Sequence, residues 1–386
     1  MMDAESLPEI RKKLHQIAEL SEHEEQTSEF IVSYLKRCNP SRIIEHVGGY
    51  GVLCVFDFDS TGPCIVLRAE LDGLPISEKS NQPYRSTHPG VSHSCGHDGH
   101  MSILLGLATF LSTKPANMNG RVVLLFQPAE ETAVGAKKVM EDERFHKLNP
   151  THIFGLHNIP LNPLGEIIVK KGVFASASQG LIIRIHGISS HAGHPDQGVS
   201  PLQGMLDCVK ILTEISDSYS HNNPDSFITI IHMKLGKRAF GTSPGEGLVM
   251  ATFRSFNQQI IDEMAALAIK RLEESFSSFQ GSWDHEWVEV FPSIVNHPDC
   301  VDAITSAANS LGFCYNEINE PFSWSEDFSY YLQRYKGAFF CVGSGENQHV
   351  LHHPSYDFPD DLIEQGVKIF QQILYETQIR YKKGIG

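Results

Sequence analysis

The residues best suited to chemistry gather in the stretch His93–His100, which reads His-Ser-Cys-Gly-His-Asp-Gly-His. It holds one cysteine, three histidines and one aspartate, and these side chains bind divalent metals. Gly96 and Gly99 allow backbone angles that other residues resist, so the segment can fold tightly around an ion. The alternative is a polar loop with chance histidines, because the chain contains 20 of them. The remaining polar clusters of the chain favour the metal site.

These other clusters follow predicted strands. The apolar runs 64–70, 121–126 and 151–156 predict buried strands, and they alternate with helical patterns such as 101–111. This alternation predicts a mostly parallel α/β sheet, in which the loops after the strands share one ligand-binding edge. The polar side chains in those loops are Asp72, Cys95, His97, Glu130, Glu131 and His157. We therefore expect them to converge into a metal site.

The length of 386 residues exceeds what a single core usually supports, so two domains are expected. Residues 177–289 predict the order strand-helix-strand-strand-helix-strand, which is the ferredoxin-like split unit. We predict that this α+β domain is inserted into an α/β domain formed by residues 1–176 and 290–386. Apolar residues at helical spacing over 5–37 predict one N-terminal helix.

Composition limits the partners and the compartment. The formal net charge of −15 argues against nucleic acid and against an anionic membrane surface. No apolar run reaches the roughly 20 residues of a membrane helix, and the N-terminus lacks the apolar core of a secretory signal. The eight cysteines are scattered, as is typical of free thiols in a reducing cytosol. We therefore expect a cytoplasmic protein with a small-molecule substrate.

With these motifs assembled, the chain resembles the metal-dependent amidohydrolase and exopeptidase family of aminoacylases and carboxypeptidase-G-type enzymes. Within it, the chain is most similar to the branch of hippurate hydrolases and plant auxin–amino-acid-conjugate hydrolases. The matching segments are 11–15, 69–75, 95–100, 126–131, 154–158, 190–192, 252–254, 326–328 and 351–354. They follow one another along nearly the whole chain, so the resemblance is specific for the family but far less so for the substrate.

The resemblance implies a site for two divalent metal ions, whose identity (zinc, manganese, cobalt or nickel) it leaves open. The implied ligands are Cys95, His97, Glu131, His157 and His352, with Cys95 as the bridging ligand. Glu130 matches the general base of the family. His191, in the inserted domain, matches the histidine that reaches the scissile carbonyl from a lid, and the family implies a homodimer through that lid and dimerisation domain.

Other residues have less certain roles. Asp72 and His100 are candidates to support the metal ligands, and Asp98 either orients a ligand histidine or only shapes a turn. Arg254 either binds a substrate carboxylate or forms a structural ion pair. The chain departs from the family pattern at Gly241-Thr-Ser-Pro244, where the family commonly has Asn-x-x-Pro. An amide contact from that position is absent, which leaves the preferred substrate open.

The expected activity is hydrolysis of the amide bond of N-acyl, N-aroyl or peptidyl amino acids by metal-activated water. One alternative is a dipeptidase or exopeptidase of the same family. Another is an amidase that uses Cys95 as nucleophile, although His97, two residues away across a glycine, is poorly placed as its base. A third is a metal-binding member without catalysis.

Overall fold

The structure is a computed structural model that describes residues 5–384, except for the side chains of residues 59 and 60. The chain divides into two compact units. The first consists of Met1–Phe174, Ile294–Pro321 and Glu326–Gly386, and the second of Ala175–Ser293 and Phe322–Ser325. The predicted inserted domain, 177–289, falls within the second unit. No helix among the described residues is long and apolar enough to span a membrane.

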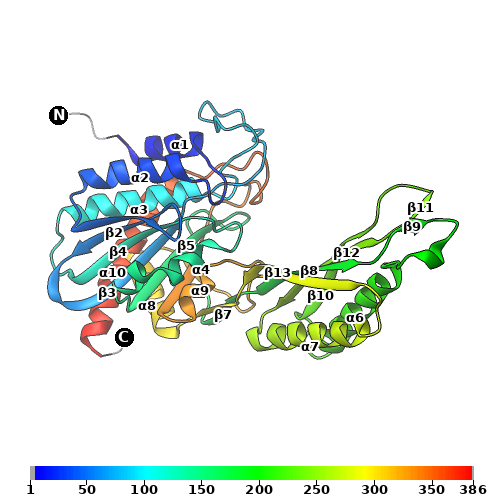
Figure 1. Cartoon of the computed structure of the whole chain (residues 1–386). Coiled ribbons are helices and arrows are strands. Elements are labelled where there is room, and N and C mark those ends of the chain that lie inside the picture. Colours follow the sequence, from blue (N-terminus) through cyan, green and yellow to red (C-terminus); the bar gives the residue numbers. More distant parts are fainter. Residues whose placement is uncertain (1–4, 385–386) are drawn as a thin grey trace. The chain divides into compact units, whose positions relative to one another are not determined.

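The first unit contains an eight-stranded sheet (Figure 1). In spatial order its strands are β1 (Arg42–Val47), β2 (Gly51–Asp57), β4 (Asn119–Gln127), β3 (Asp59–Glu70), β5 (His152–Ile159), β16 (Lys336–Gly343), β6 (Ile167–Val169) and β15 (Tyr315–Glu317). The four central strands, β4, β3, β5 and β16, run parallel to one another. The predicted class, α/β with a large, mainly parallel sheet, is confirmed.

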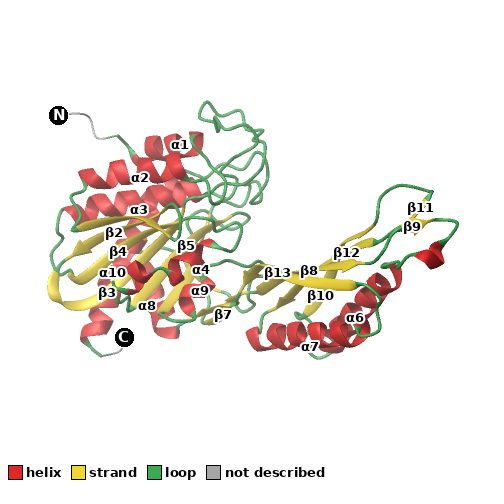
Figure 2. Cartoon of the chain, viewed as in Figure 1, coloured by secondary structure: helices red, strands yellow, loops and turns green. Residues whose placement is uncertain are grey.

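Helices cover both faces of this sheet (Figures 1 and 2). One face shares a single apolar core with α1 (Leu7–Gln16), α2 (Glu25–Arg37), α3 (His97–Ser112), α8 (Pro298–Leu311) and α10 (Asp361–Lys382). The short helices α4 (Gly135–Glu141) and α9 (Ser329–Leu332) lie on the other face, and α5 (Glu143–His146) follows α4 in the chain. Apolar burial from both sides explains why the central strands are continuous hydrophobic runs.

The prediction of one helix over 5–37 is wrong, because residues 17–24 separate α1 from α2. Glu22 has a φ of 67°, a left-handed conformation that a right-handed helix cannot accommodate. Leu20 instead forms a bridge with Gly73, beyond the end of β3. The break thereby brings the N-terminal segment to the edge of the sheet where the polar residues gather.

The second unit has a four-stranded antiparallel sheet covered on one face by two helices (Figure 2). Along the chain its elements are β8 (Ala177–His186), α6 (Leu202–Ser220), β10 (Phe227–Leu235), β12 (Glu246–Ser255), α7 (Gln258–Phe276) and β13 (Ser282–Phe291). The spatial order β10-β12-β8-β13 is that of the ferredoxin-like unit. Its shorter elements are β9 (Ser190–His191), η1 (Pro195–Gln197) and β11 (Thr242–Ser243). In the first unit, β14 (Ile294–Asn296) pairs with β7 (Gly172–Ala175), whose last residue already belongs to the second unit.

Candidate metal centre

The segment Cys95-Gly96-His97 lies where the chain turns into α3. Helix α3 begins at His97, four residues earlier than the apolar pattern predicts, so His97 lies in its first turn. Gly96 has a φ of 95°, and a Cβ atom there would lie 2.5 Å from the Asn158 Oδ1 atom. Only glycine fits this position. The tight turn buries Cys95 and His97 next to each other at the carboxyl edge of the sheet.

Two predicted histidine ligands, His97 and His157, both direct their Nε2 atom toward the site. His97 Nδ1 donates to the backbone oxygen of Asp72 at 2.8 Å, and His157 Nδ1 donates to that of Asn158 at 2.7 Å. When either ring is neutral, its Nε2 lone pair is therefore available to a metal ion. His157 Nε2 lies 3.4 Å from Cys95 Sγ. This fixed ring orientation is the usual arrangement around metal-binding histidines.

His352 reaches the site from the loop before α10. Its backbone has a φ of 64°, which is uncommon for a residue with a side chain and typical of functional positions. Its N–H donates to the Ser94 backbone oxygen at 2.9 Å, so this loop is bonded to the Cys95 segment. The ring Nε2 lies 3.7 Å from Glu131 Oε2, and half of the side chain (52%) stays exposed. Its imidazole therefore lines the open side of the site.

The five predicted ligands form two overlapping groups. In one, the ligand atoms of Cys95, His97 and His157 all lie within 4.8 Å of one another. In the other, those of Cys95, Glu131 and His352 do so. Zinc bond lengths of about 2.3 Å to sulfur and 2.0 Å to nitrogen at a tetrahedral angle place the two ligand atoms about 3.5 Å apart. The Cys95–His157 separation of 3.4 Å agrees with that value.

Unpaired polar atoms and accumulated charge also fit a cation here. His97 Nε2 and Glu131 Oε1 are buried, face each other across 3.8 Å, and have no hydrogen-bond partner among the described residues. Burial, and then the negative charges of Glu326, Glu131 and Asp327, raise the pKa of Glu130 well above its usual range. Burial likewise raises the pKa of Glu131 to about 7. A divalent cation would satisfy the open lone pairs and offset this repulsion.

Glu130 lies beside the two groups of predicted ligands. Its Oε2 is 3.9 Å from His97 Nε2, and its side chain is almost completely buried. Glu130 and Glu131 both lie in the turn between β4 and α4, yet Glu131 faces His352 whereas Glu130 belongs to a carboxylate cluster with Glu326 and Asp327. Adjacent glutamates thus occupy different environments, as two different roles require.

Asp72, His100 and Asp98 surround the centre in different ways. Asp72 accepts from His97 through its backbone oxygen and from the Glu131 N–H through Oδ2 at 3.0 Å, so it contacts two predicted ligands. Both ring nitrogens of His100 are hydrogen-bonded, to Glu70 at 2.7 Å and to Asn158 at 2.6 Å. The Asp98 carboxylate instead bonds two residues of α1 and none of the predicted ligands.

These α1 residues, Arg11 and His15, form a buried network of hydrogen bonds and ion pairs. No role was assigned to them from the sequence. Arg11 donates to Asp98 at 3.0 Å and to Asp357, in the His352 loop, at 2.9 Å. His15 Nδ1 lies 2.9 Å from Asp98 Oδ2. Burial opposes protonation of His15, but the charges of Asp98 and Glu78 raise its pKa to about 9. The motif at 11–15 in the sequence pointed to these residues without revealing their partners.

The second unit carries His191 and Arg254. His191 is exposed in β9, and its Nδ1 accepts from the Gly193 N–H at 3.0 Å, so the neutral ring carries its proton on Nε2. Arg254, in β12, donates to the Ser323 backbone oxygen at 2.7 Å. It forms no ion pair with the described residues of the chain. Burial lowers its pKa.

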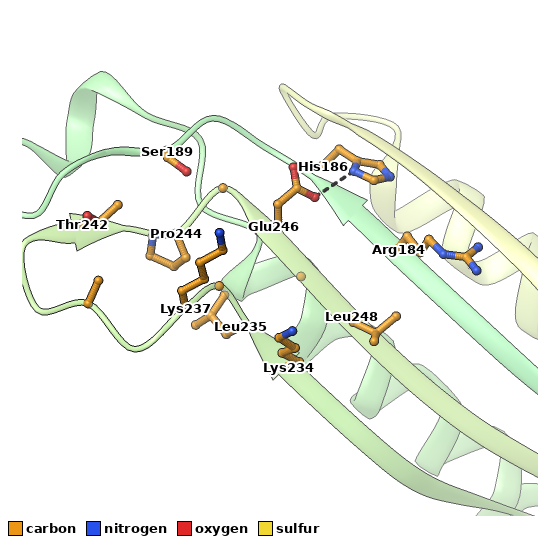
Figure 3. A pocket seen from close by; sticks show the side chains of 14 residues that line it. Arg184, His186, Ser189, Lys234, Leu235, Lys237, Thr242, Pro244, Glu246 and Leu248 are labelled. Atoms are coloured by element: carbon orange, nitrogen blue, oxygen red, sulfur yellow. Dashed lines mark hydrogen bonds and ion pairs between the residues drawn. The ribbon is translucent and has the colours of Figure 1, made fainter.

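A cavity of about 880 Å³ opens on the sheet of the second unit (Figure 3). Thr242 and Pro244, from the segment that departs from the family pattern, line it together with Lys234 and Lys237. None of the predicted site residues lines this cavity. Gly241 itself has open space around it, since a Cβ atom there would meet nothing within 4 Å.

The chain belongs to the peptidase family M20/M25/M40, whose family model matches residues 66–376. It is therefore an enzyme, a hydrolase of amide bonds, and the alternative of a non-catalytic member is not supported. The relatives agree with the resemblance found in the sequence. An N-acetyl-L-cysteine deacetylase of Bacillus subtilis is 31% identical over 371 residues, covering 96% of this chain and 87% of the relative. A hippurate hydrolase of Campylobacter jejuni is 29% identical over 370 residues, covering 94% of each chain.

A solved structure has the same fold over nearly its whole length. The YXEP protein of Bacillus subtilis, described as a dinuclear metal-binding peptidase of the M20 family, superposes with a TM-score of 0.78. It is 27% identical in sequence, and the match covers 95% of this chain and 96% of that one. The family and the fold are thus established independently of the side-chain geometry described above.

Proposed function

We propose that this hydrolase cleaves the amide bond of N-acyl, N-aroyl or peptidyl amino acids and releases the free amino acid. The observation that carries the proposal is the pair of ligand groups that share Cys95, with Glu130 beside them. Similarity to an N-acetylcysteine deacetylase and to a hippurate hydrolase supports this substrate class. A preference for dipeptides, as in a dipeptidase or exopeptidase, is the alternative within the same chemistry.

The proposed cofactor is a pair of divalent ions with Cys95 as their shared ligand. The other ligands are His97, Glu131, His157 and His352. When bound, the ions supply Lewis acidity and lower the pKa of water to about 7, which makes it a nucleophile at neutral pH. Cysteine and histidine favour zinc, whereas imidazole and carboxylate ligands also suit manganese, cobalt and nickel.

Glu130 is the proposed general base. It accepts a proton from the attacking water and delivers it to the leaving nitrogen, a contribution of about 10²–10⁴-fold in rate. Its position 3.9 Å from the free nitrogen of His97 supports this role, since that nitrogen faces the proposed metal centre. The backbone N–H of Glu131 donates to the Asp72 carboxylate, which leaves the Glu131 side chain free to serve as a ligand.

The second unit contributes the proposed substrate contacts. His191 carries its proton on Nε2 and is exposed, so it can donate to the carbonyl oxygen that becomes negative during attack. Arg254, which has no carboxylate partner among the described residues, is proposed to bind the carboxylate of the amino-acid product. This choice favours substrate binding over the structural ion pair that the sequence left open.

We also propose a homodimer formed through the second unit. β10 is an edge strand of its sheet, and it exposes Phe227, Ile231, Met233 and Leu235. An uncovered apolar edge strand promotes association, and a second copy would cover it. A cytoplasmic location is supported by the cysteines, because all eight are free thiols and seven of them are buried.

One observation favours the amidase with a cysteine nucleophile. Cys95 Sγ lies 3.4 Å from His157 Nε2, so the thiol has a nearby imidazole that the sequence did not reveal. However, burial and then the charges of Glu131 and Glu130 raise the pKa of the Cys95 thiol well above its usual range. A catalytic cysteine needs a lowered thiol pKa, so this environment disfavours a thiolate nucleophile.

The test is a panel of N-acyl, N-benzoyl and dipeptide substrates, assayed after metal removal and reloading with zinc, manganese, cobalt or nickel. We expect no turnover in the metal-free protein, recovery with at least one ion, and faster cleavage of N-acyl amino acids than of dipeptides. Full activity after removal of all metal, together with loss on thiol alkylation, would instead establish the cysteine mechanism. Cleavage of dipeptides alone would establish the dipeptidase.

A further inference from the structure

The turn that carries Glu130 and Glu131 has an unfavourable backbone. It spans residues 128–135, and both Ala129 and Ala133 adopt left-handed conformations, with φ of 51° and 60°. Such conformations persist only where surrounding contacts fix them. Two internal backbone bonds shape the turn, from Ala133 N–H to Glu130 O and from Gly135 N–H to Ala129 O. They do not attach it to the rest of the first unit.

Asp327 attaches both ends of this turn. Its Oδ2 accepts from the Ala136 N–H at 2.9 Å, just after the turn, and from Gln127 Nε2 at 2.8 Å, just before it. Gln127 Nε2 also lies 2.9 Å from Oδ1. The Asp327 carboxylate is completely buried and comes from a segment 191 residues beyond Ala136 in the chain. One side chain therefore closes the base of the turn.

Arg68 holds Asp327 in place. It is completely buried in β3, and its Nη2 donates to Asp327 at 2.7 Å and to Glu326 at 2.9 Å. Its Nε donates to Gln127 Oε1 at 2.8 Å, so the guanidinium contacts both partners that meet at the base of the turn. Nη1 bonds Glu70. A planar guanidinium with several donors fixes such an arrangement better than a point charge.

Two other carboxylates hold the opposite side of the turn. Glu24 accepts from the Ala129 N–H at 2.7 Å, and Asp72 accepts from the Glu131 N–H at 3.0 Å. These contacts involve single amides within the turn. Among the described residues, Asp327 differs because its carboxylate bonds the residues at both ends, so its loss frees the turn to shift as a body.

We propose that Asp327 is a positioning residue that fixes Glu130 and Glu131 relative to the Cys95 segment, with Arg68 as its support. The inference rests on the proposed function, in which Glu131 binds an ion and Glu130 is the general base. It gives a role to the Glu326-Asp327-Phe328 motif, whose function the sequence left open. If Asp327 were only a counter-ion for Arg68, its loss would lower stability without altering the metal environment.

The first measurement tests the attachment without any metal. In metal-free protein, hydrogen exchange of the amides in segment 127–137 is compared between the wild type, Asp327→Asn and a matched control, Asn296→Ala. Asn296 is equally buried and bonds the Phe339 backbone N–H and C=O, but it does not contact the turn. We expect faster exchange in this segment only in Asp327→Asn. Wild-type exchange there would overturn the proposal.

The second measurement tests the effect on the site. Each protein is loaded with cobalt, and its visible absorption spectrum, its rate of cobalt loss to a chelator, kcat and KM are recorded. For Asp327→Asn we expect a shifted spectrum, cobalt loss about 10–100-fold faster, and a similar fall in kcat with KM nearly unchanged. Asn296→Ala should keep the wild-type spectrum and kcat although it is less stable. An unchanged spectrum and rate of cobalt loss in Asp327→Asn would overturn the proposal.

A double variant provides rescue. Gln127→Glu combined with Asp327→Asn restores the charge and lets residue 127 accept from the new amide, while Arg68 keeps an acceptor at 127. We expect at least about tenfold recovery of kcat and slower cobalt loss than in the single variant. If Asp327→Asn does not fold, Gln127→Met, which removes one end of the attachment, should shift the cobalt spectrum. A wild-type spectrum in that variant would refute the proposal.

These measurements distinguish failure of the proposed function from failure of the positioning role alone. If the wild-type protein binds no cobalt and remains inactive, the proposed function fails, and the positioning role fails with it. If the wild type binds cobalt and turns over, but the Asp327 and Gln127 variants keep its spectrum, only the positioning role fails.

Discussion

Arg11 provides the clearest test of how α1 supports the proposed metal centre. Its guanidinium is almost completely buried and contacts three carboxylates, those of Asp98 at 3.0 Å, Asp357 at 2.9 Å and Asp360 at 2.6 Å. Through Asp98 it supports the first turn of α3, and through Asp357 it supports the His352 loop. We predict that Arg11→Met destabilises the first unit, because the side chain keeps its bulk but loses every bond to these carboxylates.

The magnitude follows from the burial of the partners. Asp98 is completely buried, so removal of one of its two cationic partners costs up to about 3–5 kcal/mol. Asp357 and Asp360 are 24% and 30% exposed, and their pairs add less than about 1 kcal/mol each. Because His15 still bonds Asp98 in the variant, we expect the lower end of this range for Asp98, and about 3–5 kcal/mol for the three pairs in total.

Urea unfolding followed by far-UV circular dichroism measures this change. Tryptophan fluorescence is unsuitable, because Trp283, Trp287 and Trp324 all belong to the second unit. The matched control is Lys12→Met, whose side chain is 36% exposed and lies 3.4 Å from Asp360, and for which we expect less than about 1 kcal/mol. If Arg11→Met costs no more than the control, the buried network does not support the first unit as described.

Three further predictions concern single residues. The folded pKa of His15, about 9, lies above its unfolded value, so its stabilising effect is complete below about pH 6.5 and disappears as the pH rises through 9. We expect unfolding titrations of the wild type to lose about 3 kcal/mol more over that range than those of His15→Gln. A thiol reagent should label one cysteine rapidly in the native protein, the exposed Cys314, and none rapidly in Cys314→Ser. Gly99→Ala should lower the free energy of unfolding by about 1–3 kcal/mol, because its Cβ would lie 2.5 Å from the Phe358 ring. The control Gly241→Ala, in open space, should change the free energy of unfolding by less than about 0.5 kcal/mol.

Each of these expectations has a definite contrary result. A stability curve for His15→Gln with the same slope as the wild type between pH 6.5 and 9 would mean that another group titrates there. Rapid labelling of several thiols would mean that the core opens more readily than the burial of seven cysteines indicates. Equal effects of Gly99→Ala and Gly241→Ala would contradict the close packing around Gly99.

The sequence predicted the parts of the fold that depend on local patterns. Continuous apolar runs identified β3, β4 and β5, and their alternation with helices identified the parallel sheet. The edge strands β1 and β15 were missed, because both are largely exposed and lack an apolar run. The break at 17–24 was missed because it is fixed by a long-range bridge from Leu20 to Gly73.

For the site, residue type and placement after strands predicted the convergence of Cys95, His97, Glu131 and His157, and the structure brings them together. Asp72, a candidate to support the ligands, contacts two of them, but the buried support from Arg68 and Asp327 was not predicted. Arg68 lies inside an apolar strand, and Asp327, although part of the matching segment 326–328, follows no strand, so neither has a local signal of its role. Their partners are distant in the sequence, and only the folded chain reveals that Asp327 bonds both Gln127 and Ala136.

The central claim is that Glu131 binds a metal ion while its neighbour Glu130 transfers the proton. The most direct measurement compares Glu130→Gln with Glu131→Gln, using the metal content per chain and the turnover of the amide that the wild type cleaves fastest. We predict that Glu130→Gln retains both ions but loses about 10²–10⁴-fold in kcat, whereas Glu131→Gln loses bound metal. Metal loss in Glu130→Gln with retention in Glu131→Gln, or wild-type turnover in Glu130→Gln, would contradict the account.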